Sequence, residues 1–522
     1  MRTSLTPNDL QRLSQLGIAA EEAERQIDLL LNPPPAIRLA RPCRLGDGIR
    51  RLEAPQYPEL LALFEPAARR GRLSRLVPAS GAASRMFKTL LPFLSDGGEP
   101  GRQELQRRVE RGGRSAADLL SLVDNLERFA FYPTLERRLG ERGVNLSAAR
   151  ASESYVTICK YLLTDAGLGY AALPKALIEF HRYPEGARTA LEEQLVEAAG
   201  CGRDASGACR THFTILPGWQ ERFAAELERI RARQQERLAV DFQVGFSTQD
   251  HSTDTLAVDL DGRPLRLDDG SLLLRPGGHG ALLANLAVLR GDLVFIRNID
   301  NILPERLQET PIRWKKLLCG TLLALERRTH ELLAGLEADD PPEALLESGL
   351  SFVSAELLNP AAQSLRSAPA ARKRQFLLER LERPLRVCGV VPNQGEPGGG
   401  PFWVADESGE GSLQIVEHSQ IDAADPDQQA IWASATHFNP TDIVCSVRDS
   451  RGRPYDLQRY VDARAVFIAR KSHQGRELKA LERPGLWNGA MAHWNTVFVE
   501  VPAETFAPVK TVFDLLRPEH QN

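Results

Sequence analysis

A carboxylate stands just beyond a strand-like apolar segment. Residues 292–296 (DLVFI) predict a buried strand, and the chain continues as Arg-Asn-Ile-Asp-Asn, which places Asp300 past the strand's carboxyl end. Ligands of open α/β sheets gather at that edge. A carboxylate there is a hard oxygen ligand for Mg²⁺, which takes one or two carboxylates together with phosphate oxygens and water. We therefore predict a Mg²⁺ ligand at Asp300; the alternative is that it caps the helix that follows.

A second segment has the features of an anion-binding loop. Residues 75–91 (RLVPASGAASRMFKTLL) predict a short strand, a tight turn and a helix. The small side chains of Ser80, Gly81 and Ala82 would let a phosphate approach the backbone N–H groups, and Arg85 would add positive charge. The alternative is a plain turn from strand to helix. The patterns G-x-x-x-x-G-K-[ST] and G-x-G-x-x-G do not fit this loop, which disfavours ATPases and NAD enzymes.

Other polar residues could face the same ligand. Lys175 follows Pro174 at the start of an apolar segment and could reach a phosphate, although a solvated lysine has the same sequence context. Gln249 lies just beyond a strand predicted over residues 241–246. His279 stands among glycines in Arg-Pro-Gly-Gly-His-Gly, where Gly278 would permit close backbone approach while the imidazole faces the ligand.

An acidic pair and a late basic segment leave further possibilities open. Asp259 and Asp261 have the spacing of a metal-binding pair, but Gly262 directly after them predicts a hairpin turn. Lys471 and Lys479 could join an anion site, whereas such lysines usually lie on the surface.

Composition excludes several classes of protein. The 522 residues carry 65 Lys+Arg against 69 Asp+Glu, a net charge of -4, with no basic stretch that would follow a nucleic-acid backbone. No window approaches the length of apolar sequence that spans a membrane, and Met1 to Asn8 lack a signal-peptide core. The seven cysteines form no C-x-x-C pair, which favours reduced thiols. We expect a cytoplasmic protein with neither nucleic-acid nor membrane partners; the sequence makes no prediction of oligomeric state.

Hydrophobic spacing predicts an α/β chain in three parts. Residues 1–72 are expected to form an N-terminal helical element, because proline ends the helical pattern at Asn32. Residues 73–385 alternate strands and helices, with a helical insertion at about 100–165, and predict an α/β core. Residues 386–522 are expected to be a β-rich part that completes the core.

Several motifs, taken in order, resemble the UDP-sugar pyrophosphorylase superfamily. They are the small-residue loop, Pro-Lys at 174–175, Phe-x-x-Gln at 246–249, Pro-Gly-Gly-His-Gly at 276–280, Asn-Ile-Asp-Asn at 298–301, Ile-Val-Glu-His-Ser at 415–419, Asn-Thr at 495–496 and Pro-Val-Lys-Thr-Val-Phe-Asp-Leu-Leu at 508–516. The whole chain is also similar to a bacterial family, domain of unknown function 4301, in its Pro-Ala-Ser-Gly-Ala loop and its Gly-Glu-Pro-Gly-Gly-Gly-Pro-Phe-Trp-Val run.

The resemblance implies a GT-A-like, Rossmann-type nucleotidyltransferase core with a mixed sheet, in which residues 73–385 bind the nucleotide and residues 386–522 bind sugar and phosphate. It also implies a nucleoside triphosphate (UTP favoured) and a sugar 1-phosphate as substrates, and Mg²⁺ as cofactor. It assigns the catalytic cations to Arg85, Lys175 and Lys510, nucleotide contacts to Ser80, Gly81, Ala82, Gln249 and Gly278, sugar-phosphate contacts to His279, Glu417 and Asn495, and the metal to Asp300. The loop departs from the family's glycine-rich form, so neither base nor sugar follows. A GT-A-like glycosyltransferase that uses Asp259 and Asp261, or a non-catalytic nucleotide-binding regulator, remains the alternative.

Overall fold

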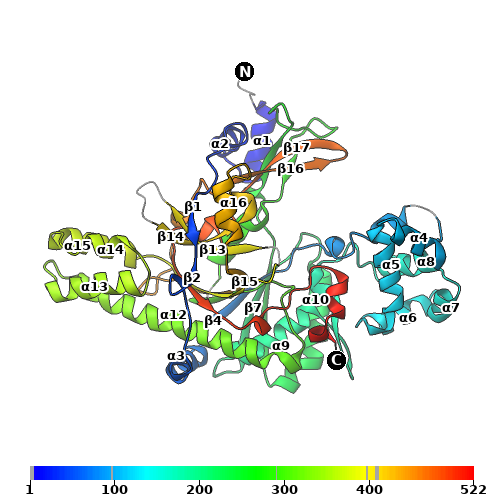
Figure 1. Cartoon of the computed structure of the whole chain (residues 1–522), viewed down its shortest axis with the longest axis horizontal. Coiled ribbons are helices and arrows are strands. Elements are labelled where there is room, and N and C mark those ends of the chain that lie inside the picture. Colours follow the sequence, from blue (N-terminus) through cyan, green and yellow to red (C-terminus); the bar gives the residue numbers. More distant parts are fainter. Residues whose placement is uncertain (1–4, 96–97, 290, 396–397, 406–410, 522) are drawn as a thin grey trace.

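A large mixed sheet forms the centre of the molecule (Figure 1). The computed structural model describes residues 5–95, 98–289, 291–395, 398–405 and 411–521. Nine strands run in the order β2 (Arg44–Leu45), β3 (Gly48–Arg50), β18 (Asn495–Glu500), β12 (Leu385–Pro392), β15 (His437–Ser446), β11 (Leu293–Ile296), β4 (Leu73–Pro78), β7 (Ala208–Thr214) and β8 (Asp241–Ser247). Strand β15 is antiparallel to both neighbours, and the other pairs are parallel. The predicted α/β class with a mixed sheet is confirmed.

The strands of this sheet are apolar on both faces because each face is covered. In β11, Leu293 and Phe295 pack among side chains of α12 (Glu309–Leu336), whereas Val294 and Ile296 pack with α11 (Leu282–Ala287). Such alternation puts successive side chains into two separate cores. Helices α3 (Tyr57–Arg69), α9 (Ala190–Gly202) and α10 (Gln220–Leu238) complete the covering layers. This packing fixes the position of the short strand β11, and therefore the position of the loop after it, which carries Asp300.

Three smaller sheets attach to the large one. They are β1 (Leu39–Pro42), β13 (Gly399–Ala405) and β14 (Gly411–Glu417); β10 (Leu274–Arg275), β9 (Thr255–Val258), β17 (Arg476–Glu482) and β16 (Phe467–His473); and β5 (Glu179–Tyr183) with β6 (Gly186–Thr189). The four-stranded sheet carries α1 (Pro7–Gln15) and α2 (Ala20–Leu31) on one side, where Leu13, Ile27 and Leu30 pack against Leu256 and Leu481. Helix α16 (Pro426–Ala433) packs beside β1.

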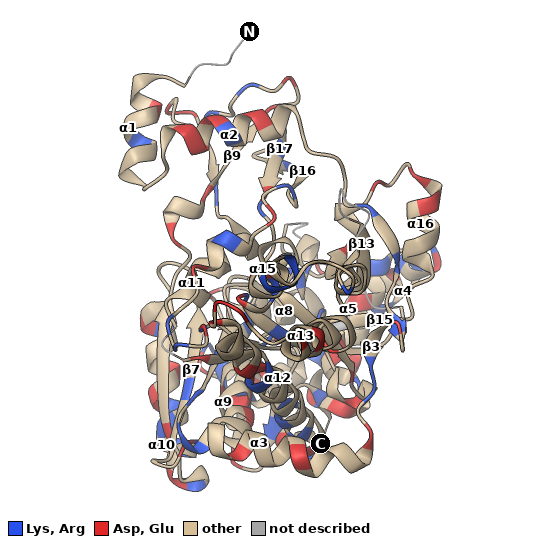
Figure 2. Cartoon of the chain, turned by 90° about the vertical axis from the view of Figure 1, so that its left-hand side faces the viewer, with Lys and Arg blue, Asp and Glu red and all other residues tan. Residues whose placement is uncertain are grey.

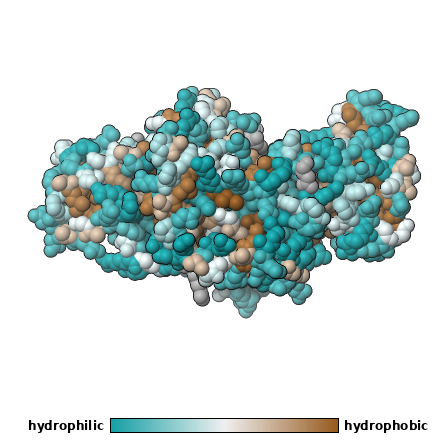
Figure 3. Space-filling view, turned by 90° about the horizontal axis from the view of Figure 1, so that it is seen from below, coloured by the Kyte–Doolittle hydropathy of each residue, from teal (hydrophilic) through white to brown (hydrophobic). Residues whose placement is uncertain are grey.

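Two groups of helices extend from opposite ends of the molecule (Figure 1). One contains α4 (Arg102–Glu110), α5 (Arg114–Asp124), α6 (Tyr132–Gly140), α7 (Leu146–Ala151) and α8 (Tyr155–Leu163), which is where the sequence predicts a helical insertion. The other continues α12 with α13 (Glu343–Ala355), α14 (Ala361–Ser364) and α15 (Ala370–Leu381). Residues of both charge signs are scattered over the whole molecule in Figure 2, and one face in Figure 3 shows separate apolar spots in a hydrophilic surface.

Two local expectations differ from the structure. The helix predicted after the small-residue loop is replaced by short 3-10 turns at Ala83–Arg85 and Leu91–Leu94, the second of which begins around Pro92. Residues 39–50, expected within a helical element, form β1 to β3: β1 and β3 pair with strands from the last third of the chain, and β2 pairs with β3. The seven cysteines are buried free thiols, as predicted. No helix in the described ranges is long and apolar enough to cross a membrane.

Two stacked histidines fasten the carboxyl end of the chain. His181 on β5 and His520 near the C-terminus lie parallel with ring centroids 5.3 Å apart, and Nε2 of His181 is 2.9 Å from Nδ1 of His520. Nδ1 of His181 is 3.1 Å from a carboxylate oxygen of Glu193, which also accepts from the Tyr183 hydroxyl at 2.6 Å. This contact holds the segment that contains Lys510 against the core.

We expect the replacement His520→Gln to flatten the dependence of stability on acid pH. Burial, and then the neighbouring His181, lower the pKa of His520 to about 3. The unfolded chain binds this proton near pH ~6.5, so the free energy of unfolding falls as pH drops from about 6.5 toward about 3. Melting temperatures measured across this range should fall more for the wild type than for the variant. The half-buried His330 supplies the control His330→Gln; parallel curves for wild type and His520→Gln would contradict the assignment.

Candidate functional site

Two lysine ammonium groups donate hydrogen bonds to one carboxylate just beyond the carboxyl end of β11. Lys175 Nζ donates to Asp300 Oδ2 at 2.9 Å, and Lys510 Nζ donates to the same oxygen at 3.1 Å. The Asp300 and Lys175 side chains are each 11% exposed, whereas Lys510 is 48% exposed. Lys175 is therefore not a solvated surface lysine, and Asp300 lies at the predicted sheet edge with its carboxylate held by lysines. Lys510 is the cation of this group that faces solvent.

Backbone contacts hold the Asp300 and Lys510 segments together. The amide of Val509 donates to the carbonyl oxygen of Asp300 at 2.9 Å, and the amide of Ala507 donates to the side-chain oxygen of Asn301 at 2.9 Å. Asp514 then accepts the amide of Lys510 at 2.8 Å, which fixes the backbone of the lysine. The Asn-Ile-Asp-Asn and Pro-Val-Lys-Thr motifs thus form one structural unit.

The small-residue loop joins the same unit through the Pro-Lys segment. The amide of Lys175 donates to the carbonyl oxygen of Gly81 at 2.9 Å, and the amide of Ala83 donates to the carbonyl oxygen of Leu173 at 2.9 Å. Gly81 and Ala82 are exposed, and a Cβ added at Gly81 would meet no atom within 4 Å. The space over this loop is open to a ligand.

The charges of the Asp300 cluster are mutually dependent. Burial raises the pKa of the Asp300 carboxyl, but Lys175 and Lys510 outweigh that effect and hold the pKa below its ordinary value. Burial lowers the pKa of Lys175, although Asp300 opposes the change. Asp300 is therefore ionised at neutral pH, and its charge is what keeps the shielded Lys175 ammonium stable.

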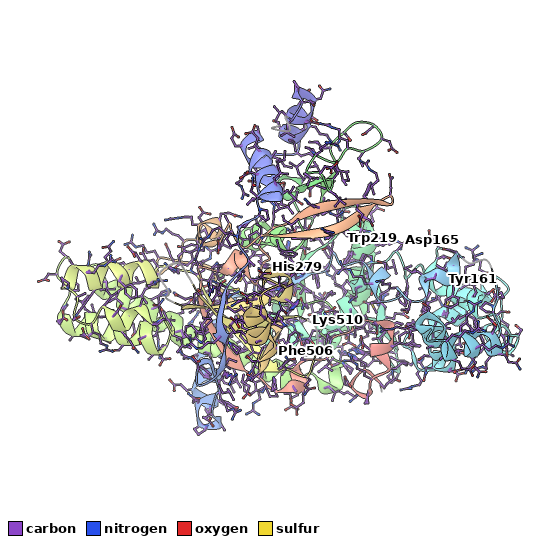
Figure 4. All side chains as sticks on the ribbon, turned by 45° about the horizontal axis from the view of Figure 1, so that its top comes forward. Tyr161, Asp165, Trp219, His279, Phe506 and Lys510 are labelled. Atoms are coloured by element: carbon purple, nitrogen blue, oxygen red, sulfur yellow. The ribbon has the colours of Figure 1, made fainter. Side chains whose placement is uncertain are left out.

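A pocket of about 240 Å³ gathers several predicted site residues, and Lys510 of the Asp300 cluster is near enough for its charge to act on His279 in the pocket lining. Arg85, Gly278, His279 and Glu417 line it. His279 is solvent-exposed at the mouth of the pocket, where partial desolvation by the surrounding protein lowers the pKa of its imidazole against the opposing charges of Glu417 and Glu482. Its ring lies 4.6 Å from the ring of Trp487 between centroids. Figure 4 shows His279 and Lys510 in the central part of the molecule.

Gln249 and Gly278 are in direct contact. The Gln249 side-chain amide donates to the carbonyl oxygen of Gly278 at 3.0 Å. Gly278 has a φ of 59°, in the left-handed region that favours glycine. The two residues expected to face a nucleoside are thus brought together.

The structure separates one predicted residue from the others and adds one that was not predicted. Asn495 begins β18, which runs parallel to β12, so it lies at the opposite end of the sheet from Asp300, where its amide donates to the Arg380 carbonyl oxygen at 2.8 Å. The pocket instead contains Asn488, only 4% exposed, whose Oδ1 has no hydrogen-bond partner among the described residues. The Trp-Asn-Gly sequence has no spacing pattern that would have identified Asn488.

The acidic pair of the alternative interpretation is a turn. Asp259 Oδ1 accepts the amide of Arg263 at 2.9 Å, Gly262 has a φ of 86°, and the Asp261 side chain is 73% exposed. Among the described residues, no group of three or more His, Cys, Asp or Glu side chains could hold a metal ion. The predicted hairpin turn is confirmed.

Comparison with solved structures returns sugar-nucleotide enzymes. The UDP-glucose pyrophosphorylase of Leishmania major is 12% identical, with 98% of this chain and 79% of that chain covered and a TM-score of 0.42. The uridine diphosphate N-acetylglucosamine pyrophosphorylase of Trypanosoma brucei is 14% identical, with 98% and 84% covered and a TM-score of 0.47. A search of curated proteins gave no match.

The family comparison covers almost the whole chain. Residues 6–521 match the family described as a domain of unknown function, DUF4301. This confirms the second resemblance noted in the sequence, and the chain belongs to that family.

Proposed function

We propose that the protein is a nucleotidyltransferase that joins a nucleoside triphosphate, with UTP favoured, to a sugar 1-phosphate and releases pyrophosphate. The observation that carries this proposal is the pair of lysines on Asp300 beside a pocket that contains Arg85, His279 and Glu417. In the reaction, a phosphate oxygen of the sugar 1-phosphate attacks the α-phosphorus as the bond to the bridging oxygen breaks. An ionised phosphate is its own nucleophile, so no proton has to be removed from it.

Positive charge is what this reaction requires of the protein. Two anionic substrates must approach one another, and charge accumulates on the phosphate oxygens as pyrophosphate leaves. We assign Arg85, Lys175 and Lys510 to offset that charge, with Lys510 exposed enough to reach a phosphate in the open pocket. The half-buried Ser80 and the exposed Gly81 and Ala82 would hold the triphosphate through their backbone N–H groups.

The remaining residues supply recognition. We assign Gln249 and Gly278 to contact with the nucleoside. His279, as a neutral donor or acceptor, would contact the sugar or its phosphate, and Glu417 would contact the sugar hydroxyls. Asn488 takes the role first given to Asn495, because its unsatisfied Oδ1 lies in the wall of the pocket. A buried amide oxygen without a partner gains a hydrogen bond when a hydroxyl binds.

Asp300 also fits a Mg²⁺ ion. It supplies one carboxylate, which is enough for an ion that takes its other ligands from phosphate and water. Mg²⁺ bound there would neutralise phosphate charge and polarise the phosphoryl oxygens. Lys175 and Lys510 would then be available to the substrate phosphates.

A thermal-shift screen with UTP, CTP, GTP, ATP and dTTP, each with and without Mg²⁺, tests the proposal. A ligand at 100 times its dissociation constant stabilises the native state by about 2.7 kcal/mol, which such a screen detects. We expect stabilisation by one triphosphate, increased by Mg²⁺. Binding without pyrophosphate release would identify a non-catalytic regulator, and absence of stabilisation by every triphosphate would contradict the proposal.

Asp300→Asn should lower the rate of pyrophosphate release by about 100-fold or more, because the metal and both lysines lose their shared charge. The variant keeps the shape of the side chain. Asp261→Asn, in the exposed hairpin turn, is the matched control and should retain wild-type turnover. Normal kcat in Asp300→Asn would remove the metal assignment.

Lys510→Ala should also lower kcat by about 100-fold, because a phosphate charge is left without its partner in the transition state. Since the side chain is 48% exposed, the melting temperature should change little. Lys316→Ala, which removes a surface pair with Glu65 at 3.7 Å, provides the control. Unchanged kinetics would mean that the Pro-Val-Lys-Thr motif is only structural.

Gln249→Ala should reduce discrimination among nucleobases by about tenfold, the effect of losing a positioned hydrogen bond of roughly 1 to 1.5 kcal/mol. The measurement is the ratio of kcat/KM for the preferred triphosphate to that for each competitor. A ratio identical to that of the wild type would place the base elsewhere.

A further inference from the structure

One wall of the pocket is a cross-strand row from the four-stranded sheet. The row consists of Arg275 on β10, Thr255 on β9, Glu482 on β17 and Phe467 on β16. Arg275 pairs with Thr255, and Phe467 pairs with Glu482. Strands β9 and β17 pair through Ala257 and Ala480, and the same register places Thr255 opposite Glu482. Residues opposite one another in a sheet share a face, so the four side chains form one surface.

Three members of the row are suited to a sugar ring. The hydroxyl of Thr255 and the carboxylate of Glu482 can hydrogen-bond to sugar hydroxyls, and the ring of Phe467 offers an apolar surface to the C–H groups of the sugar. Glu417 and Asn488 line the same pocket. This is the chemistry of a pocket with an apolar surface and a few convergent polar groups.

Arg275 is the cation on this wall without a carboxylate. Lys471 is paired with Glu482, and Arg483 contacts Glu22 at 3.1 Å and the carbonyl oxygen of Thr253 at 2.9 Å. The guanidinium of Arg275 has neither a hydrogen bond nor an ion pair with the described residues, and the residue is half-buried at the pocket. A guanidinium in such a place matches a planar carboxylate with two parallel hydrogen bonds.

The phosphate-binding cations come from other parts of the molecule. Lys175 and Lys510 are hydrogen-bonded to Asp300 and are not part of the wall formed by the four-stranded sheet. Arg85 extends from the small-residue loop. A neutral sugar offers Arg275 only uncharged hydroxyl acceptors, whereas a carboxylate offers two charge-assisted hydrogen bonds, which favours acidic over neutral sugars.

We propose that Arg275 selects a sugar 1-phosphate whose ring carries a carboxylate, so that the substrate is an acidic sugar of the uronate class. This inference rests on the proposed function for the identity of the ligand as a sugar phosphate. Arg275 would then determine substrate specificity, and it lies on β10, outside the motifs that resemble the UDP-sugar pyrophosphorylase superfamily.

Binding of matched pairs of sugar 1-phosphates tests the proposal without any nucleotide. Glucuronic acid 1-phosphate is compared with glucose 1-phosphate, and galacturonic acid 1-phosphate with galactose 1-phosphate, by titration calorimetry of the full-length chain. We expect the acidic member of at least one pair to bind about tenfold more tightly or better, as a charge-assisted bidentate contact gives. Arg275→Met should abolish that preference, and Arg275→Lys should retain part of it. Arg263→Met, at an exposed turn of the same sheet, is the control and should keep the wild-type preference.

The result separates this inference from the proposed function. No preference for the acidic member in either pair, no binding by either acidic member, or a preference that survives Arg275→Met would overturn the role of Arg275. Failure of the triphosphates to bind would instead contradict the nucleotidyltransferase proposal, while a preference that depends on Arg275 would still stand.

Discussion

The site depends on one carboxylate that neutralises two lysines from distant parts of the chain. Lys175 and Lys510 lie 125 and 210 residues from Asp300, yet both donate to the same oxygen. Without Asp300, two ammonium groups would face each other, and the more shielded Lys175 would lose the charge that opposes its desolvation. This contact therefore defines where the loop, the Asn-Ile-Asp-Asn segment and the carboxyl-terminal segment meet.

A buried charge network lies next to this contact. Arg297, near the end of β11, donates to the carbonyl oxygen of Asn301 at 2.5 Å and is paired with Asp442 on β15. Glu197 on α9 accepts from Lys315 at 3.0 Å and from Arg75 at 2.9 Å. Burial raises the pKa of Glu197, but the surrounding cations lower it further, so it stays ionised. Charges buried on this scale require partners, and the partners fix the elements that carry them.

The sequence predicted the parts of this arrangement that are local. Residues 292–296 predicted β11, and the position of Asp300 after it followed from the rule for strand ends. The register that places Phe467 opposite Glu482 was not predictable, because cross-strand pairing depends on contacts between separate segments. The prediction of a helix after Gly81 was wrong: the segment forms short 3-10 turns, and its burial of Met86 and Phe87 in the core depends on contacts with distant parts of the chain.

In the candidate site, too, residues in local motifs were predicted, whereas residues brought in by contacts between separate segments were not. Motif order pointed to Lys175, Asp300 and Lys510, which the structure brings together. It also pointed to Asn495, whose strand direction places it at the other end of the sheet. Asn488 belongs to the pocket through the folding of neighbouring segments, and no local pattern marks it, whereas Arg275 directly precedes the Pro-Gly-Gly-His-Gly motif but was given no role from the sequence.

Phosphorus NMR of a reaction mixture shows directly whether the protein transfers a nucleotidyl group to a sugar 1-phosphate. The purified chain is mixed with Mg²⁺, the triphosphate that stabilises it and an acidic or neutral sugar 1-phosphate. We predict that the triphosphate and sugar 1-phosphate signals are replaced, one for one, by those of a nucleoside diphosphate-sugar and pyrophosphate. Unchanged spectra, or release of inorganic phosphate in place of pyrophosphate, would contradict it.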